Sequence, residues 1–122
     1  MSLRSHVHAI TIEEHPGRVR GLVDGAELFD TERAKILHEG RLPDRIYVPL
    51  EDFDAGLLEE SDRSSHCPFK GDARYWSVRV GDRVVEDAIW AYPTPIDDVS
   101  EIEGFASFYP EKLSEIEGAP GD

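Results

Sequence analysis

Hydrophobic and polar residues alternate with a period of two along much of this chain, which is the pattern of β-strands with one buried face. The apolar runs are short, rich in β-branched and aromatic residues, and bounded by Gly, Pro or Asp, which favour turns. Residues 33–38 (RAKILH) fit either a strand or one helical turn. The clearest strands are predicted at residues 7–12 (VHAITI), 18–23 (RVRGLV), 26–31 (AELFDT), 45–50 (RIYVPL) and 105–109 (FASFY).

Two tight turns predict hairpins. Asp24-Gly25 separates two alternating segments, and an Asp-Gly pair favours the primed turn whose central residues need positive φ. Gly81-Asp82 divides the stretch 73–92 in the same way. These turns indicate antiparallel pairing of the strands on either side.

Helix is confined to short stretches. Residues 51–61 (EDFDAGLLEES) have room for a turn of helix, and residues 95–104 (PIDDVSEIEG) resemble a short acidic helix. The segment after Pro110 is predicted to be an amphipathic turn followed by a frayed tail, over about residues 111–122. Together these elements predict a mainly β, antiparallel fold with one or two short helices, as a single domain over residues 1–122.

The net charge of the chain limits the kinds of partner that it can bind. The 122 residues carry a net charge of -13 that is spread along the sequence. Such a surface repels phosphate backbones and anionic headgroups, so nucleic-acid and membrane binding are not expected. No apolar run approaches the roughly 20 residues of a spanning helix, and the N-terminus lacks the apolar stretch of a signal peptide. We therefore predict a soluble, cytoplasmic protein.

The stretch 64–76 (SSHCPFKGDARYW) contains the single cysteine, Cys67. A catalytic cysteine needs a thiolate and a base to generate it. His66 is its neighbour, but adjacent residues of an extended chain point to opposite faces. Cys67 is thus a candidate nucleophile or redox thiol, and a small buried hydrophobic residue is the alternative. One cysteine excludes an internal disulfide.

Lys70 and Gly71 form a candidate anion site. A lysine beside a flexible glycine offers an ammonium and a backbone N–H to an anion. The alternative is an exposed lysine next to a turn glycine. Glu39, which follows an apolar segment and precedes Gly40, is a candidate for the rim of a cleft.

The aromatic side chains on these strands are either core residues or the walls of a pocket for a planar ligand. Trp76 and Trp90 lie on adjacent strands of one predicted hairpin. The full set is Tyr47, Tyr75, Trp76, Trp90 and Tyr92.

A metal site is not expected, because the available ligands lack the tight spacing of known zinc motifs. No cofactor is predicted either. The residues that would have to contribute to a metal site are His38, Glu39, His66, Cys67 and the pair His6-x-His8.

These motifs together resemble the small bacterial family catalogued as domain of unknown function 427, which is sometimes labelled nucleotidyltransferase-like. The resemblance covers about residues 17–110. It rests on the segments Tyr47 to Pro49, Cys67 to Gly71, Tyr75-Trp76, Trp90 to Pro93 and Phe108-Tyr109.

The resemblance implies a β-tent-like fold, in which two antiparallel sheets meet at an angle, as in zinc-bearing methionine sulfoxide reductases and the thalidomide-binding domain of cereblon. The four-cysteine zinc site of such relatives does not carry over to a chain with one cysteine. Nor does the chain contain the grouped carboxylates and phosphate-cradling turn that nucleotidyl transfer needs.

We therefore predict a small β domain that binds a compact ligand, with an anionic group, in an aromatic-lined pocket between its sheets. The alternatives are an enzyme that depends on Cys67, and an interaction module or homodimer formed through an exposed sheet edge. The predicted ligand-binding residues are Glu39, Tyr47, Lys70, Gly71, Tyr75, Trp76, Trp90 and Tyr92.

Overall fold

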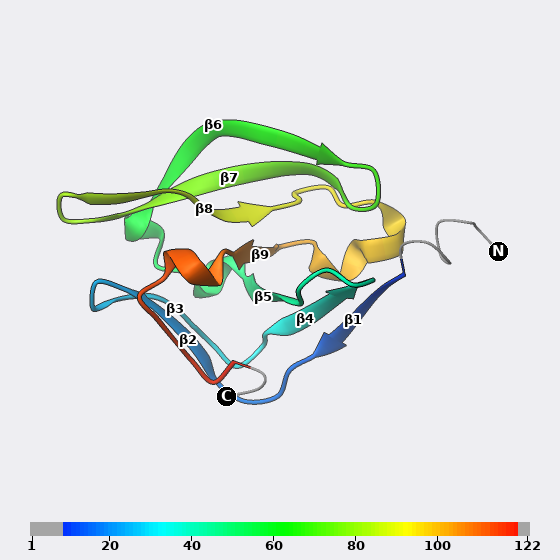
Figure 1. Ribbon diagram of the computed structural model, residues 1–122, viewed down its shortest axis with the longest axis horizontal. Coiled ribbons are helices and arrows are strands. Elements are labelled where there is room, and N and C mark those ends of the chain that lie inside the picture. Colours follow the sequence, from blue (N-terminus) through cyan, green and yellow to red (C-terminus); the bar gives the residue numbers. More distant parts are fainter. Residues whose placement is uncertain (1–8, 120–122) are drawn as a thin grey trace.

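The computed structural model describes residues 9–119, and these residues form two antiparallel sheets (Figure 1). The predicted fold class is confirmed. The larger sheet contains, in spatial order, β1 (Ile10–Glu14), β4 (Lys35–Glu39), β5 (Arg45–Pro49), β9 (Phe105–Phe108), β8 (Arg83–Ala91), β7 (Gly71–Val80) and β6 (Leu58–Cys67). The smaller sheet contains β10 (Glu115–Glu117), β2 (Val19–Val23) and β3 (Ala26–Thr31).

Both predicted hairpins are present. Asp24 and Gly25 connect β2 to β3 with φ values of 48° and 82°, the positive φ at both central residues that a primed turn requires. Gly81, with a φ of 60°, lies in the turn between β7 and β8. The ambiguous segment around residues 33–38 contributes strand β4 and no helical turn.

The helical segments of the described chain are short 3-10 turns. The predicted turn of helix after residue 50 consists of two such turns, and the predicted acidic helix is a 3-10 segment interrupted at Val99, whose φ and ψ are not helical. None of the helices within residues 9–119 is long and apolar enough to cross a membrane. The four turns are η1 (Leu50–Asp52), η2 (Ala55–Leu57), η3 (Asp97–Ile102) and η4 (Pro110–Lys112).

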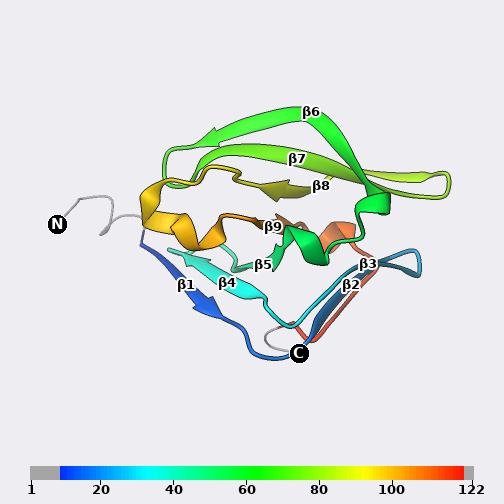
Figure 2. The same ribbon diagram turned by 180° about the vertical axis from the view of Figure 1, so that it is seen from behind.

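The prediction of a frayed tail after residue 110 is wrong for the described residues. Strand β10 pairs with β2, with Ile116 opposite Gly21, and runs along it at the lower edge of Figure 2. Ile116 packs against the core while the glutamates on either side face solvent, so this short segment has the alternation of an edge strand. Residues 120–122 lie outside the described residues.

Two hydrophobic clusters occupy opposite faces of the larger sheet. The first, the inter-sheet core, lies where the smaller sheet covers the larger one; the ring of Phe29 lies 5.0 Å from that of Phe108 and 5.3 Å from that of Phe53. The second cluster contains no residue of the smaller sheet among its described members. We call the rings of its four tyrosines and its tryptophan the aromatic cluster: Tyr47, Tyr75, Trp90, Tyr92 and Tyr109.

Candidate functional site

The aromatic cluster gathers all four tyrosines of the chain on one face of the larger sheet. Tyr75 of β7 lies directly opposite Trp90 of β8, and the ring centroids of Trp90 and Tyr109 are 4.5 Å apart. Strand alternation explains the gathering, because it turns Tyr75 and Trp90 to the face opposite Trp76 and Ile89.

A buried ion pair lies at one end of this face. The Nζ atom of Lys70 donates a hydrogen bond to Oε1 of Glu39 at 2.5 Å, and the two side chains are only 10% and 8% exposed. The Lys70 ammonium also lies 5.9 Å from the centroid of the Tyr92 ring. The alternative of an exposed Lys70 is therefore excluded.

The backbone around Lys70 is fixed from both sides. Its N–H donates to the Cys67 carbonyl at 3.1 Å, and its carbonyl accepts from the N–H of Ile96 at 2.9 Å. Gly71 follows with a φ of 125°, and a Cβ atom there would lie 3.2 Å from the carbonyl oxygen of Thr94. Glycine is needed at this position because of both the φ value and the close approach. The turn thus directs Lys70 inward.

Burial raises the pKa of the phenols of Tyr47 and Tyr92 above the ordinary value of 10. At Tyr47 a hydrogen bond with the Trp90 side chain opposes the rise, and the negative charge of Glu39 adds to it. Both phenols are protonated at neutral pH, so each carries an O–H donor.

Cys67 is half-buried and packs against the same cluster at the end of β6. His66, its neighbour, bonds through Nδ1 to Asp72 at 2.7 Å. His38 lies between two carboxylates, those of Glu13 and Asp44. Within residues 9–119, neither histidine is hydrogen-bonded to the thiol.

The structure gives no metal centre in the part of the chain that it describes: residues 9–119 contain no group of three His, Cys, Asp or Glu side chains placed to hold an ion. The pair His6-x-His8 lies outside the described residues.

Trp76 is separated from the other predicted site residues. It pairs with Ile89 and packs against the inter-sheet core, on the face opposite Trp90. The smaller sheet covers the Trp76 face and not the aromatic cluster, so of the predicted ring residues only Trp76 packs against the inter-sheet core. The register between β7 and β8 separates Trp76 from Trp90, because Tyr75, and not Trp76, lies opposite Trp90.

Two arginines that the sequence interpretation did not include lie on the aromatic cluster. The guanidinium carbon of Arg45 is 5.3 Å from the ring centroid of Trp90 and 5.5 Å from that of Tyr109. The guanidinium carbon of Arg63 is 4.3 Å from the centroid of Tyr75. Cations over aromatic faces at these distances are attracted by the ring quadrupole.

The sequence contains patterns that place Arg45 and Tyr109 near the predicted site, but none that places Arg63 there. Arg45 precedes Tyr47 by two residues in one strand, so alternation places them on the same face. Tyr109 belongs to the closing Phe-Tyr motif of the predicted family. Arg63 had no such signal, because it lies where the pairing of β6 with β7 is irregular, between Glu60 and Ser64.

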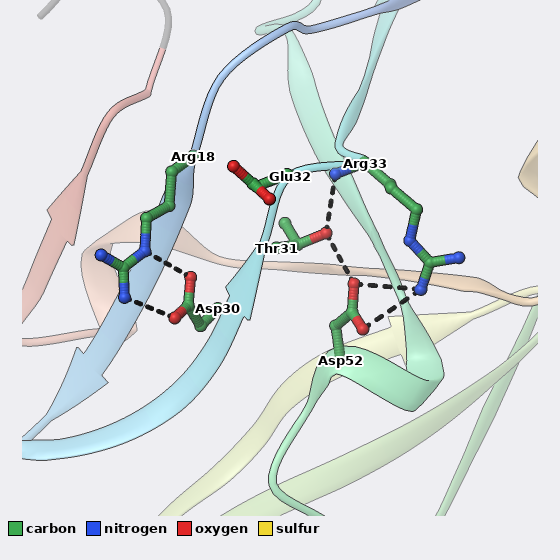
Figure 3. A pocket seen from close by; sticks show the side chains of 6 residues that line it. All are labelled: Arg18, Asp30, Thr31, Glu32, Arg33 and Asp52. Carbon is green, nitrogen blue, oxygen red and sulfur yellow. Dashed lines mark hydrogen bonds and ion pairs between the residues drawn. The ribbon is translucent and has the colours of Figure 1, made fainter.

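A polar hollow of about 530 Å³ lies elsewhere, beside β2 and β3 (Figure 3). Arg18 donates two hydrogen bonds to Asp30, and Arg33 and Thr31 both donate to Asp52. Most of the charged side chains that line this hollow bind one another, and it contains no aromatic ring that could pack against a ligand. Its lining residues are Arg18, Asp30, Thr31, Glu32, Arg33 and Asp52.

Residues 11–118 match the model of a family described as a domain of unknown function (DUF427), and the chain belongs to that family. The match extends beyond the predicted limits of residues 17–110 at both ends and includes strand β10. No curated protein gives a significant match to the chain. The family description assigns no activity, so the function has to be argued from the site itself.

Proposed function

We propose that this chain is a binding module for a compact small molecule with an anionic group, which is received by the Lys70–Glu39 pair and the rings beside it. The observation that carries the proposal is the burial of this ion pair next to Tyr92 and the half-buried Cys67.

A buried ion pair is a poor device for stabilising a fold. Removing each charge from water costs several kcal/mol, and apolar side chains of similar volume in the same places are often equally or more stabilising. Lysine and glutamate are also among the residues least often buried. A buried pair in a cluster of tyrosines whose pKa values are raised is therefore a functional-site candidate.

The geometry indicates the chemistry of the ligand. An ammonium has three N–H donors, and Lys70 directs one of them to Glu39. An anionic oxygen of the ligand would accept from Lys70 and from the phenol of Tyr92. A ligand N–H or ammonium would bind Glu39, so that both members of the pair keep partners in the complex. The ligand class is thus a small zwitterion, or an anion with an amide N–H, whose apolar part packs against the rings.

The enzyme alternative requires Cys67 to be a thiolate. His38 and His66 bond to carboxylates and His15 lies 3.0 Å from the Gly118 carbonyl oxygen, which leaves this alternative without a histidine base at the thiol among residues 9–119. Titration of the thiol with a chromogenic disulfide across pH tests it, since a catalytic thiolate reacts well below the ordinary thiol pKa of about 8.5.

The interaction-module alternative requires an exposed sheet edge, and β6 is one. Its pairing with β7 shifts register between Glu60 and Ser64, and Arg63 projects from this irregular stretch over Tyr75. Irregular pairing and charged residues at an edge disfavour the addition of another strand. We therefore place dimerisation through this edge below small-molecule binding.

A thermal-shift screen of small zwitterions and anionic amides tests the proposal, because a ligand stabilises the state that binds it. The test variant is Lys70→Met/Glu39→Leu, which removes both charges together. The matched control is Arg79→Met/Glu59→Leu, which removes an exposed pair whose atoms are 2.6 Å apart. We expect hits that raise the melting temperature of the wild type and the control but not of the test variant. A panel that stabilises all three proteins equally would refute the proposal.

A further inference from the structure

Arg45 differs from the other arginines of the described chain. Seven of the arginines within residues 9–119 have a carboxylate partner. Arg41 and Arg45 have none among the described residues, and of these two Arg45 is half-buried while Arg41 is exposed. In a protein with 26 acidic residues, a half-buried guanidinium without a carboxylate is available for an external anion.

The aromatic cluster fixes the position of Arg45. Its guanidinium lies over Trp90 and Tyr109, at 5.3 and 5.5 Å from their ring centroids. A guanidinium that stacks on a ring keeps its N–H groups in the plane of the fork, where they can bind two oxygens of one anion. The contact of Arg45 with the two ring faces uses its positive charge and not its hydrogen-bond donors.

A second guanidinium lies over Tyr75, the residue directly opposite Trp90 in the pairing of β7 with β8. Arg63 lies over Tyr75 at 4.3 Å, and the Tyr75 hydroxyl is 2.9 Å from Oγ of Ser65. The nearest carboxylate oxygen to Arg63, from Asp87, is 3.9 Å away, longer than a hydrogen bond. Arg63 is thus only loosely paired.

We infer that Arg45, Arg63 and the Tyr109 hydroxyl form a second anion site, which takes a phosphate-type oxyanion. Two forked guanidiniums and a phenol match the several oxygens of a tetrahedral anion better than the two of a carboxylate. The positive charges of Arg63 and Arg45 both act on the Tyr109 phenol, where they lower a pKa that burial raises. Tyr75, which carries Arg63, lies directly opposite Trp90, which carries Arg45, so the two cations lie over neighbouring rings of one cluster.

This site is separate from the Lys70–Glu39 pair and does not depend on the function proposed for it. The phosphate group can come from inorganic phosphate or from an organic monoester. In a monoester with a planar group, that group would lie against Trp90 or Tyr109.

The test is a titration of the full chain, followed by amide chemical shifts, with inorganic phosphate and in parallel with phenyl phosphate. The variants are Arg45→Met, and Tyr109→Phe, which keeps the ring and removes the hydroxyl. Arg79→Met is the matched arginine control, and Lys70→Met/Glu39→Leu separates this site from the one proposed above. Arg45→Lys keeps the positive charge but loses the forked guanidinium. It replaces Arg45→Met in the titration if Arg45→Met does not fold.

We expect Arg45→Met to weaken phosphate binding by about tenfold, because it removes charge-assisted hydrogen bonds, and Tyr109→Phe to weaken it less. The Arg79 variant should bind phosphate as the wild type does, and in the Lys70/Glu39 variant the shifts of amides around Arg45 and Tyr109 should still respond to phosphate. Tighter binding of phenyl phosphate than of inorganic phosphate would assign a monoester, and equal binding would assign the free anion. Phosphate binding that Arg45→Met or Arg45→Lys leaves unchanged, or no binding to the wild type, would overturn the inference.

Discussion

Lys70 Nζ and Glu39 Oε1 lie 2.5 Å apart, although three strands, β5, β9 and β8, separate β4 from β7 in the sheet. Glu39 is the last residue of β4, and Lys70 directly precedes β7. A contact across that many strands requires a strongly curled sheet, and Figures 1 and 2 both show β1 and β4 turned away from the layer of β6 and β7. The ion pair therefore connects two parts of the sheet that lie three strands apart, the end of β4 and the start of β7.

Removal of one partner should be costly. Lys70→Met leaves the Glu39 carboxylate buried without its cation, and we expect it to lower the free energy of unfolding by about 3–5 kcal/mol. Lys70→Met/Glu39→Leu should recover most of this loss, because it buries no unpaired charge. Urea unfolding of both variants measures the difference. If the double variant is as unstable as the single one, the pair does not contribute through its charges.

Gly71 should not tolerate a side chain. Gly71→Ala combines a φ of 125° with a Cβ position 3.2 Å from the Thr94 carbonyl oxygen, and we expect a loss of about 2–3 kcal/mol. Gly81→Ala is the control, since its φ is 60° and nothing lies within 4 Å of the added Cβ. Its cost should be about 1 kcal/mol. Equal losses in thermal unfolding would show that the close approach at Gly71 has no effect.

His38 should make stability depend on pH. Its Nε2 lies 2.9 Å from Glu13 and its Nδ1 2.8 Å from Asp44, and these hydrogen bonds raise its pKa above the ordinary 6.5. The stabilisation is fully present below the unfolded pKa and is lost as pH rises through the folded pKa.

Unfolding of wild type and His38→Gln, compared at intervals from about pH 5 to about pH 9, measures this contribution. The difference in unfolding free energy should be largest at the acidic end and shrink as pH rises. A difference that stays constant over this range would show that the imidazolium form makes no special contribution.

The buried tyrosines should ionise only at a pH above the ordinary phenol pKa of 10. Burial raises the pKa of Tyr47 and Tyr92 above 10. Their protonated forms therefore add stability that is complete below pH 10 and is lost above it, as the unfolded phenols ionise. An absorbance titration of phenolate should show fewer than four tyrosines ionising until the protein unfolds. Simultaneous ionisation of all four near pH 10, with the circular dichroism unchanged, would contradict the buried placement.

The sequence predicted the strands and hairpins well because their signals are local. Asp24-Gly25 and Gly81-Asp82 specify turns through φ values that few other residues adopt. β10 was missed because a three-residue edge strand, Glu115–Glu117, has too little alternation to be distinguished from a polar tail.

The candidate site was predicted in part. Residues of one strand could be assigned to a shared face, but the pairing of residues between strands depends on register, and register placed Tyr75 rather than Trp76 beside Trp90. The contact of Lys70 with Glu39 depends on how far the sheet curls, which no local pattern specifies. The sequence nevertheless indicates both residues, Lys70 as a rare cation beside a flexible glycine and Glu39 as an acid that follows an apolar segment.

The most direct test of the Lys70 site is the side-chain ¹⁵N signal of its ammonium during titration with a compound that stabilises the protein. The chain has two other lysines, Lys35 and Lys112, whose ammonium groups donate to the backbone carbonyls of Glu101 and Glu86 and serve as internal controls. We predict that the Lys70 signal shifts with saturation while the other two do not. A bound, stabilising compound that leaves the Lys70 signal unchanged would contradict the proposed site.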